Sequence, residues 1–416
     1  MRPRTCTRPV ECGARPLLPS PRSGPLGSLL TRGTRRPETS PPALQGRLVL
    51  EDGTTFEAEG FGAARTVQGE VVFTTGMVGY PESLTDPSYR GQILTFTYPL
   101  LGNYGVPSPS ARDEWGLPAG FESGEIQVRA ALMQSLEPPH HWNAKVSLPQ
   151  WAARSGVPLL VGLDTRRLTS LLRSRGVMRG SVAVGKQVPS APAMRKALGR
   201  APKYEDEDFV AEVAPRHPQL LRSKRAAAPL VAAVDCGIKA SILRSLLRRG
   251  ADVVRWPSDS IVEERFQGRK IAGILVGNGP GDPSTLETVI DSLRISEKRG
   301  TPTLGICLGQ QLLALSRGAS TFKLKYGHRG QNKPVVFPDG RACILSENHG
   351  YAVDPASLRG TGLEPWARNP DDGTLEGLRD RRGRVIALQG HPEGGPGPRE
   401  ASFVFDLFVE KLRKRA

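Results

Sequence analysis

The sequence predicts an α/β protein of two domains: a small mixed α/β domain at residues 47–184, and a doubly wound, mainly parallel domain at residues 229–416. Two patterns lead to this prediction. From Gly46 onward, apolar and polar positions alternate around the dipeptide Asp52-Gly53, as they do in the strands of a hairpin. From Pro229 onward, short apolar strands alternate with helical patterns, which is typical of a parallel sheet that binds ligands at the carboxyl ends of its strands.

Residues 1–46 differ in composition from the rest of the chain. They hold eight Arg, no Lys and only two acidic residues, which is typical of an organelle transit peptide, whereas their nine Pro disfavour an amphipathic helix. We predict a disordered N-terminal extension. If it is a transit peptide, the protein is mitochondrial or lies in another organelle, with a mature start near residues 43–48. If it is not, the protein is cytoplasmic.

The first domain is predicted to contain short strands and two capped helices. After the hairpin, residues 69–103 hold two more short strands separated by loops marked by Gly and Pro. Ser147 is predicted to cap one helix, and Asp164 or Thr165 to cap another. The following residues, 185–228, show little periodicity, so we predict a linker that is partly ordered at best.

The second domain, residues 229–416, begins with a strand and then a helix that carries Ile238, Ile242 and Leu246 on one face. A later strand runs into the loop GNGPGDP, and residues 284–299 form the next predicted helix. The loop matches neither a dinucleotide fingerprint nor a Walker motif, so the sequence indicates no nucleotide site.

Composition excludes several classes of partner. The formal net charge is +16, but Arg is spread along the chain without a recognisable nucleic-acid module, so we expect no nucleic-acid partner. The five Cys are odd in number and scattered, which argues against a disulfide framework. No apolar run approaches the length of a membrane span, so we expect no membrane partner.

Residues 301–317 carry the strongest chemical signal. A short apolar strand leads to Cys307, which stands between Gly305 and Gly309, and a helical pattern follows. Strand, sharp turn and helix around a nucleophile are the geometry of a nucleophile elbow, in which the helix N-terminus favours a thiolate. The alternative is a small buried core cysteine in a turn punctuated by Gly.

A cysteine nucleophile needs a base, and the chain has six His as candidates. His391 follows the strand RVIALQ at its carboxyl end and stands two residues before Glu393. A turn histidine is the alternative interpretation. The other five His are His140, His141, His217, His328 and His349.

Together, GICLGQQ, GNGPGDP and HPE resemble the class I (triad-type) glutamine amidotransferase family. More narrowly, EVVFTTGMVGYPESLTDPSYRGQIL, KLKYGHRGQNKP, ENHGYAVD and HPEGGPGP make the chain similar to the small, glutamine-hydrolysing subunits of carbamoyl-phosphate synthetases, from about Leu48 to Lys414. It also resembles the matching part of the animal multifunctional pyrimidine protein. The resemblance implies a glutaminase enzyme that serves arginine or pyrimidine biosynthesis.

The resemblance also implies roles for single residues. Cys307 would attack the glutamine amide, His391 would transfer protons, and Glu393 would orient the imidazole. The N–H of Leu308 and one N–H of the GNGPGDP loop would form the oxyanion hole. The residues implied to hold glutamine are Ser88, Gly279, Gly281, Leu308, Gln311, Asn348, Gly350 and Tyr351.

Four residues depart from the family pattern. Gln310 replaces a usual His, Glu347 a usual Gln, and Lys333 a common His. Gly390 replaces an aromatic residue usual before the catalytic His, a change expected to loosen the strand end that carries His391. These departures motivate an alternative function, a non-catalytic scaffold or regulatory homologue. Glutaminases of anthranilate or guanylate synthesis are disfavoured by residues 47–184.

No segment of the sequence is recognisable as ATP-handling. We therefore expect no cofactor and no metal in this chain, with ATP and Mg bound only by a large-subunit partner of a hetero-oligomer. The first domain is the expected docking platform for that partner. Its alternative role is to stabilise the second domain.

Overall fold

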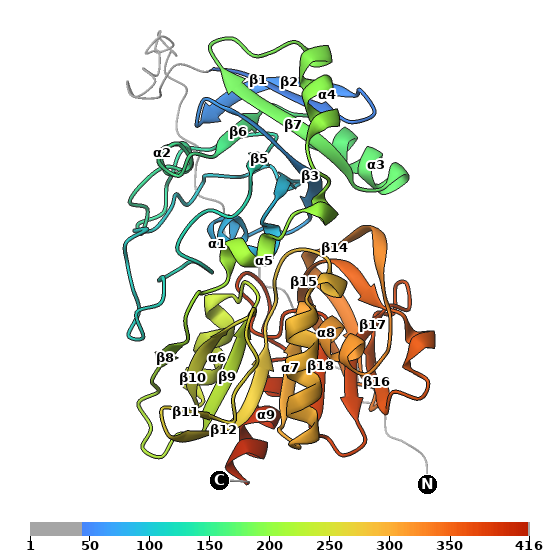
Figure 1. Ribbon diagram of the computed structural model, residues 1–416. Helices are drawn as coiled ribbons and strands as arrows, with labels where there is room; N and C mark the ends of the chain where they lie inside the picture. Colours follow the sequence, from blue (N-terminus) through green and yellow to red (C-terminus); the bar gives the residue numbers. More distant parts are fainter. Residues whose placement is uncertain (1–43, 415–416) are drawn as a thin grey trace, which may run out of the picture. The chain divides into compact units, whose positions relative to one another are not determined.

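The first part of the chain folds into a closed β-barrel (Figure 1). The computed structural model describes residues 44–414, and residues 1–43 and 415–416 lie outside that description. The barrel strands are β1 (Leu44–Leu50), β2 (Thr55–Gly62), β3 (Thr66–Thr74), β4 (Gln92–Phe96), β5 (Ala130–Leu132), β6 (Pro158–Val161) and β7 (Met178–Gly185). Their order around the barrel is β1-β2-β6-β5-β4-β3-β7, and β7 pairs back onto β1.

The predicted hairpin is confirmed. Strands β1 and β2 are antiparallel, with Leu48 opposite Phe56. In the turn, the carboxylate of Asp52 accepts a hydrogen bond from the N–H of Thr54 at 2.8 Å, which fixes the reversal of the chain.

Strand β1 begins before the predicted domain boundary. Leu44 pairs with Gly60, and Gln45 pairs with both Glu59 and Gly185. The prediction that the disordered extension reaches residue 46 is therefore wrong, because β2 and β7 offer backbone partners to residues 44–46. The transit-peptide prediction falls on residues that lie outside the described part of the chain.

Helices lie in the connections between the barrel strands. They are α1 (Tyr80–Thr85), α2 (Leu148–Arg154) and α3 (Thr165–Arg175), and the 3₁₀ turn η1 (Pro87–Tyr89) follows α1. Ser147 caps α2 in a reciprocal capping box with Gln150, and Asp164 caps α3 by accepting from the N–H of Arg167 at 2.8 Å. Both predicted helix starts are confirmed.

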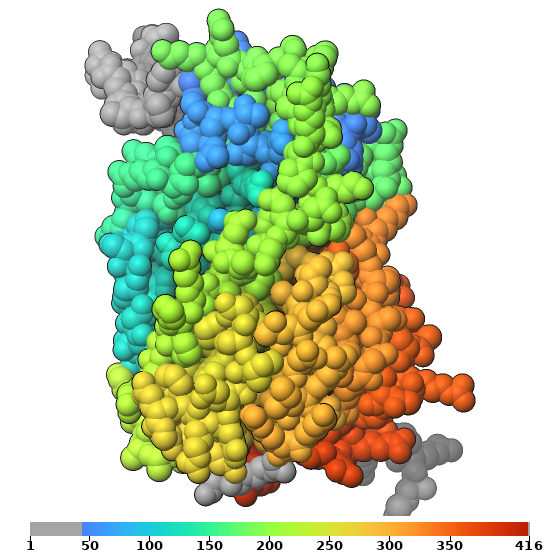
Figure 2. All heavy atoms as spheres, in the orientation of Figure 1, coloured from blue at the N-terminus to red at the C-terminus, as the bar shows by residue number. Residues whose placement is uncertain are grey.

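The segment predicted as a linker is more regular than expected. Residues 185–228 contain α4 (Ala191–Arg200), the turn η2 (Tyr204–Asp206), α5 (Phe209–Val213) and β8 (Gln219–Leu221). Its few apolar residues are too widely spaced to reveal a period, yet Met194 packs on the barrel and Val210 joins the core of the second domain. In the space-filling view, this yellow-green segment runs over the surface across the junction of the two domains (Figure 2).

The second domain is built on a sheet whose centre is parallel. Its strands are β9 (Leu230–Asp235), β10 (Asp252–Pro257), β11 (Arg265–Phe266), β12 (Arg269–Val276), β13 (Thr303–Ile306), β14 (Thr321–Val336), β15 (Ala342–Val353), β16 (Leu363–Arg368), β17 (Leu375–Asp380) and β18 (Val385–Leu388). The order is β15-β14-β16-β17-β18-β13-β12-β9-β10-β8. Strands β18, β13, β12, β9 and β10 are mutually parallel, and antiparallel strands flank them on both sides.

Helices cover both faces of this sheet, as a doubly wound domain requires (Figure 1). They are α6 (Ala240–Arg248), α7 (Glu287–Lys298), α8 (Leu308–Ser316) and α9 (Phe403–Arg413). Along β9, Val231 packs with α6 and α9, whereas Leu230 and Ala232 pack with α7 and α8. Ile238, predicted on the face of α6, is buried but lies just before that helix begins.

Two further expectations from the sequence concern disulfides and membrane-spanning segments. Cys236, Cys307 and Cys343 are free thiols. Among residues 44–414, no helix has the length and apolar character needed to cross a membrane.

Candidate active site

Cys307 lies at a strained corner between β13 and α8. It has a φ of 56°, unusual for a residue with a side chain, and directly precedes the first helical residue. The neighbouring glycines are required, because a Cβ on Gly305 would lie 2.7 Å from the carbonyl oxygen of Gly309, and one on Gly309 would lie 2.1 Å from that of Val276. The thiol side chain is 2% exposed. The predicted strand–turn–helix elbow is confirmed.

Strand pairing brings His391 to the same place. β13 and β18 are parallel neighbours, and the N–H of Cys307 donates to the carbonyl of Leu388 at 2.8 Å. Three residues later, the N–H of His391 donates to the carbonyl of Ser346 at 2.8 Å, which fixes the chain beyond the strand. The two candidate catalytic residues therefore stand at adjacent carboxyl ends of the sheet.

The imidazole of His391 is oriented by a buried ion-pair network. Its Nδ1–H donates to Oε1 of Glu393 at 2.7 Å, and the ammonium nitrogen of Lys239 lies 2.9 Å from the same oxygen. All three side chains are at most 3% exposed. Because Nδ1 carries the hydrogen bond to the carboxylate, Nε2 is the nitrogen available to the thiol.

The network also decides the charge of its members. Burial and the Lys239 ammonium disfavour the imidazolium, but Glu393 and the thiol of Cys307 outweigh them and raise the pKa of His391 to about 10. Burial alone would raise the pKa of Glu393, whereas Lys239 and His391 lower it to about 2. The imidazolium form is therefore favoured at neutral pH, where it can protonate a leaving group.

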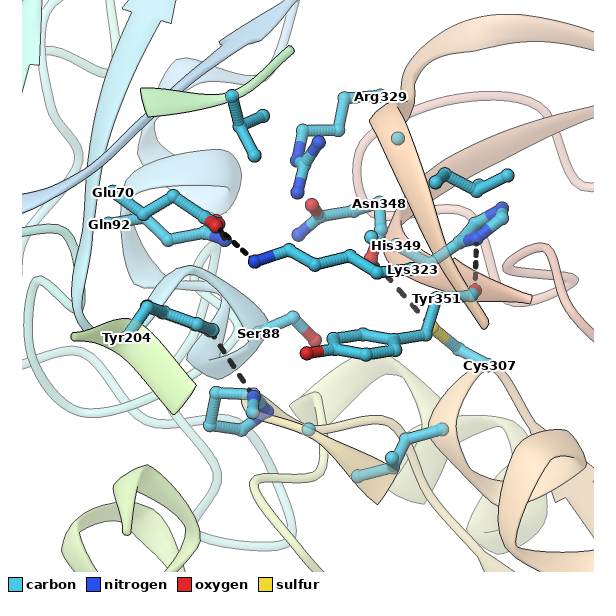
Figure 3. A pocket seen from close by; sticks show the side chains of 18 of the residues that line it. Glu70, Ser88, Gln92, Tyr204, Cys307, Lys323, Arg329, Asn348, His349 and Tyr351 are labelled. Atoms are coloured by element: carbon cyan, nitrogen blue, oxygen red, sulfur yellow. Dashed lines mark hydrogen bonds and ion pairs between the residues drawn. The ribbon is translucent and has the colours of Figure 1, made fainter. Parts of the chain in front are cut away.

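One pocket reaches Cys307 and is lined from both domains (Figure 3). The residues predicted to hold glutamine all line it: Ser88, Gly279, Gly281, Leu308, Gln311, Asn348, Gly350 and Tyr351. Figure 3 shows Ser88, Cys307, Asn348 and Tyr351 around one space. The structure thus gathers the complete predicted set beside the nucleophile, while His391 and Glu393 lie behind the thiol, outside the lining.

A buried network of hydrogen bonds connects the first domain to the residues around this pocket. The amide of Asn278, in the GNGPGDP loop, donates to the hydroxyl of Ser88 at 2.8 Å and to the carboxylate of Asp86 at 3.3 Å. The other oxygen of Asp86 accepts from the amide of Asn348 at 3.2 Å. Asn278 in turn accepts from the backbone N–H of Lys239 at 3.0 Å. The first domain therefore positions parts of the site directly.

Sequence reasoning missed the charged residues of the site. Lys239 directly precedes α6 and is buried, which no sequence motif marks. Glu70 and Lys323 form an ion pair of 2.9 Å at the pocket wall, and Gln92 donates to Glu70 at 2.9 Å. These residues come from different strands, so no local motif marks them.

The family departures fit the packing around the site. Gln310 is fully buried and donates to the carbonyl of Leu375 at 3.1 Å, so it points to the sheet and away from the pocket. Gly390 lies in a closely packed place, because a Cβ there would already lie 3.1 Å from the side chain of Leu345; that it loosens the strand end stays a prediction. Lys333 lies on β14. Glu347 is buried beside two histidines.

Comparison with known proteins shows the family of both domains. The family model described as carbamoyl-phosphate synthase small chain, CPSase domain, matches residues 48–182, and that described as glutamine amidotransferase class-I matches residues 232–411. The chain is 45% identical over 374 residues to the carbamoyl phosphate synthase small chain of Pyrococcus furiosus, covering 89% of this chain and 98% of that protein.

Two further relatives are similar over a comparable span. Identity to the carbamoyl phosphate synthase small chain of Pyrobaculum aerophilum is 42% over 369 residues, covering 88% of this chain and 99% of that protein. Identity to the arginine-specific small chain of Phaeosphaeria nodorum is 41% over 378 residues, covering 88% of this chain and 75% of that protein.

Proposed function

The chain belongs to the carbamoyl phosphate synthase small-chain family, and on that premise we propose that it hydrolyses L-glutamine to L-glutamate and ammonia. The ammonia passes to a large, ATP-dependent subunit that makes carbamoyl phosphate from bicarbonate. One observation carries the proposal: the strained Cys307 and the His391–Glu393 pair meet at adjacent strand ends, beside a pocket lined by every residue predicted to hold glutamine.

In the first half of the reaction, the sulfur of Cys307 attacks the side-chain amide carbon of glutamine. The proton of the thiol is held by His391 Nε2, and Glu393 stabilises the resulting imidazolium through Nδ1–H. The carbon–nitrogen bond then breaks, His391 protonates the leaving nitrogen, and ammonia departs. The product on the enzyme is a γ-glutamyl thioester.

In the second half, His391 removes a proton from water, which attacks the thioester carbon and releases glutamate and the free thiol. Negative charge develops on the carbonyl oxygen in both halves. The N–H of Leu308 at the start of α8 is free of intrahelical bonding and, with a loop N–H near Gly279, supports an oxyanion hole. Losing one such donor costs about 3 kcal/mol of transition-state stabilisation.

Glutamine recognition is proposed to rest on neutral hydrogen-bonding groups and on main chain. Gln311 is preorganised, since its amide donates to the carbonyl of Tyr351 at 2.8 Å and to Gln389 at 3.1 Å. The paired charges of Glu70 and Lys323 line the same pocket and suit the ammonium and carboxylate of an amino-acid head group.

The ammonia is proposed to reach the large subunit without release, because at neutral pH free ammonia is mostly ammonium and is not nucleophilic. The barrel, which already contributes Ser88 and Asp86 to the site network, is the proposed docking platform. The carbamoyl phosphate formed by the complex serves arginine or pyrimidine biosynthesis, and ATP and Mg belong to the large subunit.

A glutaminase assay with and without a large subunit tests this proposal. We expect slow release of glutamate by the chain alone, faster release in the complex, and no release by Cys307→Ala. Gln310→His serves as the matched control, because Gln310 points away from the pocket and its replacement should barely change the KM for glutamine. If no variant and no complex turns glutamine over, the protein is a non-catalytic scaffold.

A further inference from the structure

Four side chains with metal-ligand chemistry meet in the second domain and take no part in the proposed reaction. They are His328 on β14, Glu347 and His349 on β15, and Glu376 on β17. One ligand atom from each lies within 4.8 Å of all the others, and every one of the four residues is buried. The cluster adjoins the glutamine pocket, since His349 also lines that pocket (Figure 3).

Both imidazoles are held from behind by hydrogen-bond acceptors. Nδ1 of His349 lies 2.8 Å from the carbonyl oxygen of Tyr351, which can only accept, so this nitrogen carries the hydrogen (Figure 3). Nε2 of His328 lies 2.8 Å from the carboxylate of Asp372, which likewise accepts. In the neutral imidazole, the remaining nitrogen of each ring therefore points a lone pair into the cluster.

Those two nitrogens face carboxylate oxygens. Nδ1 of His328 lies 3.0 Å from Oε2 of Glu347 and 3.9 Å from Oε1 of Glu376, and Nε2 of His349 lies 3.3 Å from the same Oε2 of Glu347. Without an ion, each nitrogen suits its carboxylate only by carrying a hydrogen, as in the contact between Nε2 of His349 and Glu347. An ion bound between them would take the place of those hydrogens.

The cluster also holds polar atoms without partners. Within the described part of the chain, Nδ1 of His328, Oε1 of Glu347 and Oε2 of Glu376 are buried and form no hydrogen bond. Buried polar groups are almost always satisfied, so three unsatisfied atoms in one place indicate a missing ligand. The side chains of both glutamates are fully buried.

We propose that His328, Glu347, His349 and Glu376 form a structural site for a divalent transition-metal ion, for which Zn²⁺ is the best match. Imidazole nitrogen and carboxylate oxygen are both zinc ligands, and a closed set of four protein ligands is the usual form of a structural zinc site. The two carboxylates balance the charge of the ion. Asp372 and the Tyr351 carbonyl are the outer partners that metal-bound imidazoles normally have.

The distances are compatible with this assignment. Tetrahedral zinc with bonds of 2.0–2.2 Å separates its ligand atoms by about 3.4 Å. Three of the separations between ligand atoms are 3.0, 3.3 and 3.9 Å, and all of them lie within 4.8 Å, so the wider pairs would have to close by side-chain rotation when the ion binds. The ligands come from three strands, and the single pair close in sequence, Glu347 and His349, is too short a signal to indicate a metal on its own.

The ion would support the active site without touching the substrate. Glu347 and His349 flank Asn348, whose carbonyl is 3.8 Å from the sulfur of Cys307 and whose amide binds Asp86. Binding would join β14, β15 and β17 and fix the strand that presents Asn348 to the pocket.

Metal content measured on the full chain tests the proposal. The protein is produced with zinc in the medium, exhaustively dialysed, and its zinc per chain is determined by elemental mass spectrometry. We expect about one Zn²⁺ per chain in the wild type and less than a tenth of that in Glu376→Gln and in Glu347→Gln, which keep side-chain shape but remove a charged ligand. Asp371→Asn, an exposed neighbour of Asp372 outside the cluster, is the matched control and should keep its zinc.

A second measurement covers the case in which the ligand variants fail to fold. Asp372 is partly exposed, so Asp372→Asn should fold while weakening zinc affinity by about 10–100-fold through the orientation of His328. In protein refolded with Co²⁺ in place of zinc, the wild type should show the visible absorption of a tetrahedral cobalt site. Wild-type protein that holds no zinc after production and shows no cobalt spectrum overturns the proposal, and then protonated histidines neutralise the cluster.

Discussion

Glu393→Gln is the substitution that most sharply separates the catalytic from the structural role of the buried network. Glu393 accepts from His391 at 2.7 Å and pairs with Lys239 at 2.9 Å, and glutamine keeps its shape while removing its charge. Removing one partner of a buried ion pair costs about 3–5 kcal/mol. We expect about 3 kcal/mol, the low end of that range, because Lys239 keeps its bond to the carbonyl of Gly394 and stays close to Glu122.

Two assays measure the consequences. A loss of about 3 kcal/mol should lower the apparent Tm of the second domain by about 6–12 °C, if that domain unfolds as one unit. Loss of the orienting carboxylate should lower kcat for glutamine hydrolysis by about 10⁴-fold. The exposed Glu410→Gln on α9 is the matched control and should change neither quantity.

A double-variant cycle checks the ion pair itself. Lys239→Met combined with Glu393→Gln removes both charges, so the double variant should be more stable than the sum of the two single losses predicts. Strict additivity of the Tm losses would refute the direct pairing of Lys239 with Glu393. A kcat for Glu393→Gln within tenfold of the wild type would refute the role of Glu393 as the orienting carboxylate.

The remaining predictions concern pH, backbone and packing. The pKa of His391 is raised from 6.5 to about 10. The stabilisation that its protonated imidazole gives the folded state is therefore complete below pH 6.5 and is lost as the pH rises towards 10. The pKa of Glu393 is lowered to about 2, so the stabilisation that its carboxylate gives the folded state is lost as the pH falls from 4.5 towards 2. The Tm difference between wild type and His391→Asn should thus narrow from pH 6.5 to 10. Gly309→Ala should abolish folding or turnover, because its Cβ would lie 2.1 Å from a carbonyl oxygen. Gly199→Ala is the control: Gly199 lies in open space on α4, so this substitution should leave the Tm in a thermal melt unchanged or raise it. Gly390→Phe should lower turnover and Tm, since even a Cβ there is already crowded; a rise in kcat would contradict the packing described.

Local signals predicted the parts of the fold that local chemistry determines. The hairpin at Asp52-Gly53, the caps at Ser147 and Asp164, and the elbow at Cys307 each depend on a few consecutive residues, and each is present in the structure. The closure of the first domain into a barrel depends on pairing between β1 and β7, far apart in sequence, which no local pattern encodes.

The connecting segment shows a different limit. Phe209 and Val210 are buried in α5, but their environment is supplied by the barrel and by the second domain rather than by neighbours in sequence. Hydrophobic periodicity could not reveal a helix of five residues, since it spans little more than one turn.

At the site, motifs located the nucleophile and its neighbours but not the charges around them. Cys307 and His391 stand in short signatures at strand ends, so parallel strand order alone brings them together. Lys239, by contrast, matters through its burial against Glu393, and Asp86 through hydrogen bonds that cross from one domain to the other. Such contacts are properties of the assembled fold.

Covalent catalysis by Cys307 can be tested by trapping the thioester intermediate. Protein mixed with glutamine is quenched in acid after a short delay, and its mass and peptide fragments are measured. We expect a γ-glutamyl group on Cys307 in the wild type and none in Cys307→Ala. Glutamate released by wild-type protein with no adduct at any time, or with the adduct on another residue, would contradict covalent catalysis by Cys307.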